Sequence, residues 1–183
     1  MEQLETIIIF TNKVLKDWDN SSGWAPESVS LKLNDAMLDW MIELTDCLSI
    51  WTTKEDLLTE GELILAYTNL GSLVESWLKL FYCIYYEDYK INPKRQRGTL
   101  VEPNDMMFQS LKEFSTGKLW EKNDNWFNWI EKIQQRRNAI HSFNYRDIGT
   151  QDEFFEDIEK FNEFIHLIND RFPPAPSEAH EYI

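Results

Sequence analysis

Cysteine, glycine, proline and histidine are all scarce in this chain, and it has no long hydrophobic run. Its 183 residues include 2 cysteines, 6 glycines, 6 prolines and 3 histidines. Cys47 and Cys83 lack CxxC spacing, so we expect reduced thiols inside helices and neither a disulfide nor a zinc site. The longest apolar runs, such as residues 6–10 and 78–84, are far shorter than the roughly 20 residues of a membrane span. With no secretion signal recognised either, we expect a cytoplasmic protein without membrane contact.

The missing catalytic motifs exclude most familiar chemistries. None of the histidines lies in an H-E-x-x-H pattern, which argues against a catalytic zinc ion. The chain also lacks the GxxxxGK(S/T) and GxGxxG loops that bind phosphates, the G-x-S-x-G elbow of hydrolases and a papain-like cysteine context. We therefore expect no metal and no cofactor, which leaves acid–base chemistry by side chains.

Acidic residues outnumber basic ones overall, but the basic ones are concentrated in one segment. The net charge is −14, from 18 Lys and Arg against 32 Asp and Glu. Residues 90–146 hold 11 basic and 6 acidic residues, whereas the rest of the chain holds 7 and 26. A phosphate backbone responds to local charge, so we expect RNA contacts from this segment. The candidate residues are Lys94, Arg95 and Arg97 in a Pro- and Gly-bounded loop, together with Arg146. A loop that is merely solvated is the alternative.

Apolar positions recur at helical spacing along nearly the whole chain, and no segment alternates with period two. This pattern predicts an all-α fold, an up-and-down bundle of five to six helices. A chain of this length is most simply one domain, 1–183. We divide it into N-terminal helices (1–54), a core (55–171) and a flexible tail (172–183).

Capping and turn residues predict where the helices begin and end. The first helix is expected over 4–18, the second over 28–51, and the third from a Thr53 N-cap to residue 89. Gly71 interrupts the third helix, which predicts either close approach of another helix or a kink.

The second half of the chain has its own boundary signals. Residues 90–103 are expected to form a loop, followed by a short helix from an Asn104 cap to residue 116 that Gly117 ends. Asp124 is expected to start the next helix. Thr150-Gln151-Asp152-Glu153 is a capping box that starts a last helix ending at residue 171, before a proline-rich stretch.

The segment Arg136-Arg137-Asn138-Ala139-Ile140-His141 combines two fixed cations, an amide and an imidazole near a helix end. Arginine offers a fork of donors to phosphate oxygens, and an imidazole exchanges protons near neutral pH. At about 100° per residue, Arg137 and His141 lie within roughly 40° of each other on a helix, and Arg136 and His141 roughly 140° apart. We therefore expect Arg137 and His141 to share a face.

This segment resembles the Arg-x4-6-His signature of the HEPN superfamily (higher eukaryotes and prokaryotes nucleotide-binding), which consists of all-α domains. Arg136 to His141 gives the x4 spacing, whereas Arg137-Asn138 matches the polar residue that usually follows the motif arginine in that family. Which arginine belongs to the motif stays open. Residues 69–75 resemble the long HEPN helix that packs against the motif helix, with Glu75 as its acidic side chain.

The resemblance covers residues 55–171 and implies a metal-independent endoribonuclease of toxin–antitoxin or antiphage-defence type. In such a mechanism the ribose 2′-hydroxyl attacks the adjacent phosphate. The family's site implies that His141 is the base or acid and that Arg136 or Arg137 stabilises the transition state. Asn138 would orient the phosphate or the imidazole, and Glu75 an arginine. Two protomers typically complete the site in this family, so RNA, a second copy and an antitoxin are the implied partners.

Two other functions also fit the sequence. One is a noncatalytic HEPN-type module that binds a nucleotide or a partner protein, for example a nucleotidyltransferase. The other is a purely structural helical protein whose acidic N-terminal half is the partner surface. For the motif itself, the alternative is a helix C terminus whose cations interact with the helix dipole. Trp120, Trp126 and Trp129 are expected in the core or a dimer interface, with a base-stacking platform as the alternative.

Overall fold

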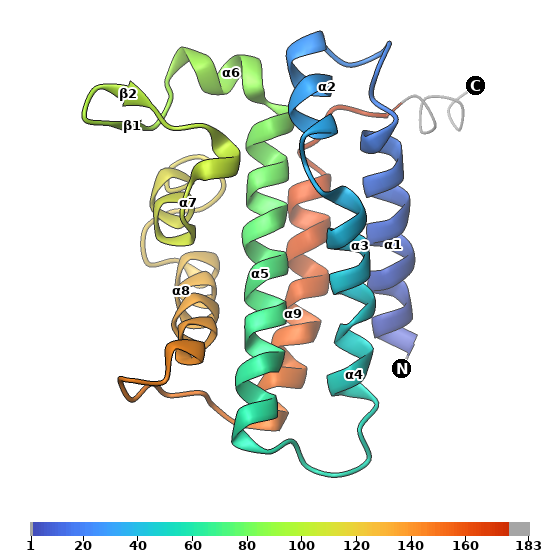
Figure 1. Ribbon diagram of the computed structural model, residues 1–183, viewed down its shortest axis with the longest axis vertical. Coiled ribbons are helices and arrows are strands. Elements are labelled where there is room, and N and C mark those ends of the chain that lie inside the picture. Colours follow the sequence, from blue (N-terminus) through green and yellow to red (C-terminus); the bar gives the residue numbers. More distant parts are fainter. Residues whose placement is uncertain (1, 176–183) are drawn as a thin grey trace.

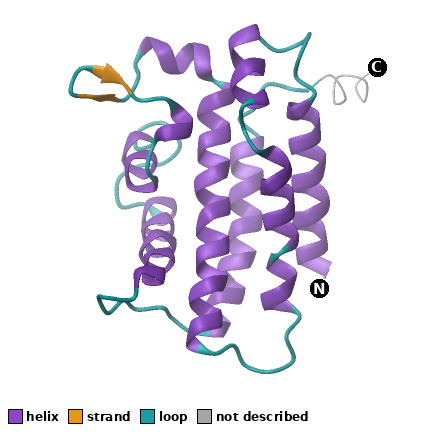
Figure 2. Cartoon of the chain, in the orientation of Figure 1, coloured by secondary structure: helices purple, strands orange, loops and turns teal. Residues whose placement is uncertain are grey.

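The protein is built almost entirely of α-helices. A computed structural model describes residues 2–175 (Figures 1 and 2), so most of the expected tail lies outside the described residues. The elements are α1 (Glu2–Asp19), α2 (Glu27–Asn34), α3 (Leu38–Asp46), α4 (Leu48–Thr52), α5 (Glu60–Ile84), α6 (Tyr86–Ile91), β1 (Arg95–Gln96), β2 (Thr99–Leu100), the 3-10 helix η1 (Pro103–Asp105), α7 (Phe108–Phe114), α8 (Asn125–Arg137), the 3-10 helix η2 (Asn138–His141) and α9 (Gln151–Asn169). The prediction of an all-α class is confirmed, but the predicted number of five to six helices is too low, because residues 2–175 form the shorter helices α2, α3, α4 and α6 beside the long ones.

The long helix α5 lies at the centre of the molecule. Figure 1 shows α9 beside it, α1, α3 and α4 on one side, and α7 and α8 on the other. Side chains around most of its circumference are buried, among them Tyr67, Leu70, Leu73, Val74 and Trp77. A helix that is apolar nearly all round is stable only when other helices cover it. Buried hydrophobic residues from Leu4 to Ile168 accordingly form one cluster around α5.

The N-terminal helices differ from the prediction in one place. The first helix is confirmed as α1, but the single helix predicted over 28–51 is wrong, because the chain forms α2, α3 and α4 there. Met37 has φ −84° and ψ 68°, outside the helical region, and a second break falls at Cys47. These breaks let three short helices follow the surface of α5, since each contacts it separately. Apolar periodicity does not register such short interruptions.

The start of α5 is also displaced from its predicted position. Thr53 is not an N-cap, because its hydroxyl donates to the Ser49 carbonyl at the end of α4. The N-cap is Thr59, whose side chain accepts from the Glu62 amide while Glu62 accepts from the Thr59 amide. This capping box satisfies two amides at once, which a single capping side chain does not. The helix then runs without interruption to Ile84, and α6 follows as a separate helix.

A small β-hairpin occupies part of the segment predicted as a loop. Strand β1 pairs antiparallel with β2, with Arg95 opposite Leu100. Arg97 and Gly98 have φ values of 53° and 85°, which is the backbone of a two-residue hairpin turn. The Tyr89 hydroxyl donates to the Val101 carbonyl at 2.5 Å and so attaches the hairpin to α6.

The later helix boundaries are mostly as predicted. The Asn104 cap is wrong, since residues 103–105 form η1 and α7 begins after Met107 without a side-chain cap. The Asp124 carboxylate accepts from the Phe127 amide at 2.8 Å and starts α8, as predicted. The capping box at the start of α9 is likewise confirmed. Its residues satisfy the free amides at the helix start, a local requirement that the sequence alone displays.

The remaining composition-based predictions concern thiols and membranes. Both cysteines are free, but Cys47 lies at the junction of α3 and α4 and is only half-buried, whereas Cys83 is buried in α5. None of the helices in residues 2–175 combines the length and the apolar character needed to cross a membrane. Within the same residues, no three His, Cys, Asp or Glu side chains group as metal ligands.

Candidate functional site

The helix that carries the Arg/His segment changes its winding within that segment. It is α-helical to Arg137 and continues as η2 from Asn138 to His141, where Ser142 ends it with φ 46°. A 3-10 turn advances about 120° per residue, so Arg137 and His141 are about 100° apart, and Arg136 and His141 about 160°. The narrow shared face expected for Arg137 and His141 assumed an uninterrupted α-helix. Of the two arginines, Arg137 remains nearer in angle to His141.

Arg136 is buried, with 4% of its surface exposed. Its Nη1 donates to the Tyr67 hydroxyl at 2.6 Å and to Asp157 Oδ2 at 3.3 Å, and its Nη2 donates to Glu153 Oε1 at 2.8 Å. Burial opposes the charge of Arg136, but the hydrogen bonds with Glu153 and Tyr67 outweigh it and raise the pKa of the guanidinium. The hydrogen bond between Arg136 and Glu153 also lowers the pKa of the Glu153 carboxyl.

Asp157 is the centre of this buried network. Its carboxylate accepts from the Tyr67 hydroxyl and the Trp129 indole, each at 2.9 Å, and forms an ion pair with Lys132 at 2.6 Å. Burial, and then the charge of Asp157, raise the pKa of the Tyr67 phenol well above its usual range. Buried charges are tolerated only when they are paired and hydrogen-bonded. The network therefore fixes the end of α8 between α5 and α9.

Gly149 and Gly71 each lie against one of the two arginines. A Cβ on Gly149, which has φ +69°, would lie 2.4 Å from the Arg136 Cζ. A Cβ on Gly71 would lie 2.7 Å from the Arg137 Cβ. Of the two readings of Gly71, the close approach of another helix is therefore confirmed, and that helix is α8. A larger residue at either position would displace an arginine.

Arg137 points to the other side and remains partly accessible, with 31% of its side chain exposed. Its Nη2 lies 2.9 Å from Glu75 Oε2, and the other oxygen of Glu75 lies 2.9 Å from Lys79 Nζ. The Arg137–Glu75 contact is an ion pair and not an aligned hydrogen bond. Oε2 of Glu75 is buried and accepts no hydrogen bond from residues 2–175. The Arg137 guanidinium also lies 5.8 Å from the centre of the Phe108 ring. Glu75 thus fixes the direction of Arg137, and donors remain at the surface.

His141 is exposed, and Asn138 is half-buried. Within residues 2–175, neither side chain has a hydrogen bond or ion pair to another group. The loop that follows exposes Phe143 almost completely, at 98%, and Tyr145 at 95%. Arg146 is exposed on the same loop. An imidazole, two aromatic rings and a cation therefore face solvent together near the end of α8.

The other predicted RNA contacts lie elsewhere. Lys94, Arg95 and Arg97 belong to the hairpin segment, which Figure 1 shows at the end of the α7–α8 side opposite to the loop after α8. The Arg95 guanidinium donates to the Gly98 carbonyl at 3.1 Å, and Arg97 is exposed at the turn. The structure thus brings Arg146 near the motif and leaves the hairpin cations apart from it.

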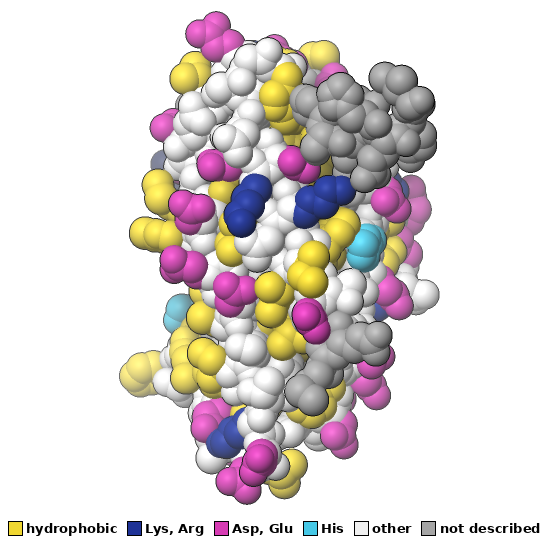
Figure 3. Space-filling model, turned by 90° about the vertical axis from the view of Figure 1, so that its right-hand side faces the viewer, with side chains coloured by type: hydrophobic (Ala, Val, Ile, Leu, Met, Phe, Trp, Pro, Cys, Tyr) yellow, Lys and Arg dark blue, Asp and Glu magenta, His cyan; other side chains and the backbone are white. Residues whose placement is uncertain are grey.

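On the face on the far side of α5, carboxylates are more frequent than cations. Figure 3 views the molecule from the α1 side, and Asp and Glu side chains are scattered over that face with few Lys and Arg among them. A polyanion is repelled by such a surface. Contact with a phosphate backbone is therefore favoured on the α8 side, which carries Arg137, Arg146 and the hairpin.

The tryptophans near the motif belong to the interior. Trp120 and Trp129 are buried, at 4% and 6% exposure, and Trp126 is half-buried with its ring edge-on to Trp129 at 5.8 Å. Trp126 and Trp129 pack between α8 and α9, where both contact Phe164, whereas the Trp120 indole donates to the Lys112 carbonyl of α7 at 3.2 Å. These rings are therefore not available as a base-stacking platform.

The sequence reasoning missed the partners of Arg136. Tyr67, Glu153 and Asp157 were not selected, although Asp157 interrupts an apolar stripe that includes Phe154, Ile158 and Phe161. A carboxylate within a buried stripe requires a cation or several donors nearby. That signal was available in the sequence of α9.

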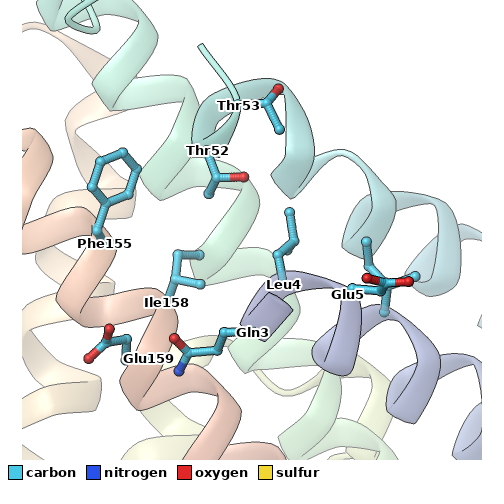
Figure 4. A pocket seen from close by; sticks show the side chains of 9 residues that line it. Gln3, Leu4, Glu5, Thr52, Thr53, Phe155, Ile158 and Glu159 are labelled. Atoms are coloured by element: carbon cyan, nitrogen blue, oxygen red, sulfur yellow. The ribbon is translucent and has the colours of Figure 1, made fainter. Parts of the chain in front are cut away.

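Comparisons of this chain with protein-family models, curated proteins and solved structures give no match. A pocket of about 380 Å³ between α1, α4 and α9 (Figure 4) includes no motif residue. Its rim carries Glu5 and Glu159 and no basic side chain. The candidate catalytic residues lie instead at the surface near the end of α8.

Proposed function

We propose that the protein is a HEPN-like, metal-independent endoribonuclease of toxin or antiphage-defence type that acts as a homodimer. The observation that carries the proposal is an exposed His141 imidazole, unpaired within residues 2–175, four residues after the partly exposed Arg137 on the same helical segment. A histidine that only stabilises a helix end is ordinarily hydrogen-bonded to the fold. An unpaired imidazole about one turn from a guanidinium suits proton transfer on a phosphodiester.

Arg137 is the substrate-facing arginine in this proposal, and Arg136 positions it. The Arg136 donors bind Tyr67, Glu153 and Asp157 inside the protein, so phosphate cannot reach them without breaking the network. The Arg137 guanidinium is partly exposed and held in one direction by Glu75. Its remaining donors match the nonbridging oxygens of a phosphate, where charge develops in the transition state.

Two copies are needed because the reaction moves two protons. The 2′-hydroxyl loses its proton to a base as it attacks phosphorus, and the departing 5′-oxygen takes a proton from an acid. The products are a 2′,3′-cyclic phosphate and a free 5′-hydroxyl. One exposed histidine fills one role, so the imidazole of a second copy fills the other. Ile140 and Phe143, at 43% and 98% exposure, supply apolar surface on both sides of His141 for that contact.

Incubation of the purified protein with RNA in EDTA tests the proposal. We expect chelator-resistant cutting with cyclic phosphate ends, and its loss by a factor of about 10² to 10⁴ in His141→Ala. Arg137→Ala should lose a similar factor, while His141→Ala keeps the wild-type melting temperature and Arg137→Ala lowers it by no more than about 4 °C. Lys122→Ala, at an exposed cation before α8, is the control and should cut normally. Normal cutting by His141→Ala would reject the proposal.

A second candidate is a noncatalytic HEPN-type module that binds a nucleotide or a partner protein such as a nucleotidyltransferase. The Glu75 carboxylate favours it, because it already compensates part of the Arg137 charge. A wild-type dimer that binds RNA or a partner and cuts none of a varied set of RNAs would support this candidate. Sedimentation analysis of His141→Ala, which should remain dimeric, separates assembly from catalysis.

A further inference from the structure

An aromatic pocket of about 310 Å³ lies far from His141, between the end of α5, α6 and the end of α7. The side chains that form it are Phe81, Tyr82, Tyr85, Tyr89, Phe114 and Lys118. Its volume is at the lower end of the roughly 300–1,000 Å³ range of small-molecule sites. The pocket in Figure 4 has one aromatic ring and two carboxylates, so the two cavities differ in the ligands they suit.

The rings of this pocket are held in fixed positions by their hydroxyl groups. The Tyr82 hydroxyl lies 2.8 Å from the Ser115 hydroxyl, and the Tyr85 hydroxyl donates to the Arg171 carbonyl. The Tyr89 hydroxyl donates to Val101, as described above. Each phenol oxygen therefore bonds to the protein frame. Tyr82 and Tyr89 are almost fully buried, at 3% and 4% exposure, so the half-buried rings of Phe81, Tyr85 and Phe114 are the ones that a ligand can reach. Tyr82 and Tyr89 both lie edge-on to Phe114, at centroid distances of 5.2 and 5.5 Å.

Lys118, an exposed residue at the edge of the pocket, brings a positive charge that forms no ion pair among residues 2–175. Its Nζ lies 3.7 Å from the centre of the Phe114 ring and donates to the Phe114 carbonyl at 2.6 Å. No carboxylate of residues 2–175 forms an ion pair with it. Burial lowers the pKa of this amine, as expected for a cation that lacks a carboxylate. An anion bound there would give Lys118 the ion pair that it lacks.

Polar groups also lie at the rim, where Asp88 and Asn92 border the pocket. A carboxylate and an amide accept hydrogen bonds from ring N–H groups and sugar hydroxyls. Tyr89 further connects the pocket to the basic hairpin, because its hydroxyl also accepts from the Lys94 amide at 3.2 Å. Aromatic walls, one cation and rim acceptors thus occur together at a single cavity.

We propose that this pocket binds a flat aromatic ring that carries an anionic group, as the base and phosphate of one nucleotide do. The ring packs against the half-buried rings of Phe81, Tyr85 and Phe114, and the anion pairs with Lys118. Stacking of a base on aromatic side chains contributes enough to be measured for each ring. The proposal does not depend on RNA cleavage at His141, because the two sites share no residue.

Calorimetric titration of the full chain with 5′-AMP, adenosine and ribose 5-phosphate tests the pocket. We expect 5′-AMP to bind at least about 10-fold more tightly than either fragment, because it alone supplies both ring and anion. Ribose 5-phosphate binding as tightly as 5′-AMP would reject the aromatic part of the proposal. Adenosine binding as tightly as 5′-AMP would reject the role of Lys118.

Two pocket variants and one control locate the binding. Lys118→Met should weaken 5′-AMP about 10-fold and leave adenosine unchanged, whereas Phe114→Leu should weaken both. Lys160→Met is the matched control. Lys160, on α9, lies 4.2 Å from the centre of the Trp126 ring of α8, so it is also a lysine over an aromatic ring, but away from this pocket. Wild-type affinity in Lys118→Met would overturn the proposal even if Phe114→Leu proves unstable. His141→Ala should bind 5′-AMP normally, which separates this test from that of cleavage.

Titration with a short RNA distinguishes binding of a free nucleotide from binding of a nucleotide within RNA. A three-residue adenylate without terminal phosphates offers the same ring and an internal phosphate. Tighter binding of this probe than of 5′-AMP assigns the pocket to a nucleotide within RNA, and weaker binding assigns it to a free nucleotide.

Discussion

Arg136 and Arg137 are neighbours in the sequence, yet they lie in opposite surroundings. Arg136 is enclosed by Tyr67, Glu153 and Asp157 from α5 and α9, whereas Arg137 is partly exposed and paired with Glu75. Both arginines pack closely against a glycine, Arg136 against Gly149 and Arg137 against Gly71. Close packing therefore does not explain why one is buried and the other partly exposed. One step along α8 rotates a side chain by about 100°, from the α9 side to the surface. The same residue type therefore stabilises the fold at one position and is available to a ligand at the next.

The largest expected effect follows from removing the buried guanidinium. Arg136→Met should lower the free energy of unfolding by about 3–5 kcal/mol, because it leaves Glu153 and Asp157 without their shared cation. Arg137→Met should cost less than about 1 kcal/mol, as expected for a partly exposed ion pair. Urea unfolding followed by circular dichroism measures both. Equal losses in the two variants would contradict the contrast.

The glycine beneath Arg136 gives the next largest effect. Gly149→Ala should lower the free energy of unfolding by about 2–3 kcal/mol, because its Cβ would overlap the guanidinium and its φ is positive. Gly23 has φ +95° and nothing within 4 Å of its Cβ position, so Gly23→Ala measures the backbone cost alone. Thermal unfolding of both variants should place Gly149→Ala at the lower melting temperature. The reverse order would show that Arg136 moves aside freely.

A smaller effect is expected at the glycine beneath Arg137. Gly71→Ala should lower the free energy of unfolding by about 1–2 kcal/mol, because the new Cβ meets the Arg137 Cβ and α8 must shift. Gly61 lies in the same helix with nothing within 4 Å, so Gly61→Ala should stabilise the protein by about 0.5–1 kcal/mol. The opposite signs are the result to look for in chemical unfolding. A stabilising Gly71→Ala would place α8 farther from α5 than described.

Acidification should change the free energy of unfolding least. The size of that change should differ between variants of Arg136 and of Arg137. The pKa of Glu153 is lowered by its bond to Arg136, and the pKa of Glu62 is lowered to about 2 by Lys54 and Thr59. A carboxyl whose pKa is lower in the folded state stabilises the protein above its unfolded value of 4.5 and loses that contribution as the pH falls. The free energy of unfolding, measured by urea from pH 6 to pH 2, should therefore decrease below about pH 4.5.

The two variants of the first prediction provide the control for this pH dependence. Arg136→Met should show a shallower decrease, because the pKa of Glu153 then returns toward its ordinary value. Arg137→Met should retain the wild-type slope. An unchanged slope in Arg136→Met would show that Glu153 owes its low pKa to the helix start instead.

Local signals in the sequence predicted part of the fold. The Asp124 cap and the Thr150–Glu153 box were identified correctly, because the side chains and the amides they bind are three residues apart. The breaks around Met37 and Cys47 and the hairpin at Arg97-Gly98 were not. They depend on how short segments fit against α5, and apolar periodicity contains no such information.

In the candidate site, too, the sequence predicted local features correctly and did not predict contacts between distant segments. The candidate residues of the α8 segment were all chosen from local spacing, but burial of Arg136 depends on Tyr67 and Asp157, which are 69 and 21 residues away. The 3-10 winding of η2 likewise changes the angle between Arg137 and His141. Contacts between distant segments decide which arginine is accessible, and a six-residue motif cannot encode them.

The two carboxylate oxygens of Glu153 link the start of α9 to the buried Arg136. Oε2 accepts from the Thr150 amide at 2.9 Å, and Oε1 accepts from Arg136 at 2.8 Å. Fraying of the first turn of α9 would therefore also detach a partner of the enclosed guanidinium. Helix ends usually open with little cost, but opening this one also removes a hydrogen bond of Arg136. Amide hydrogen exchange near Thr150 should accordingly be as slow as exchange in the middle of the bundle.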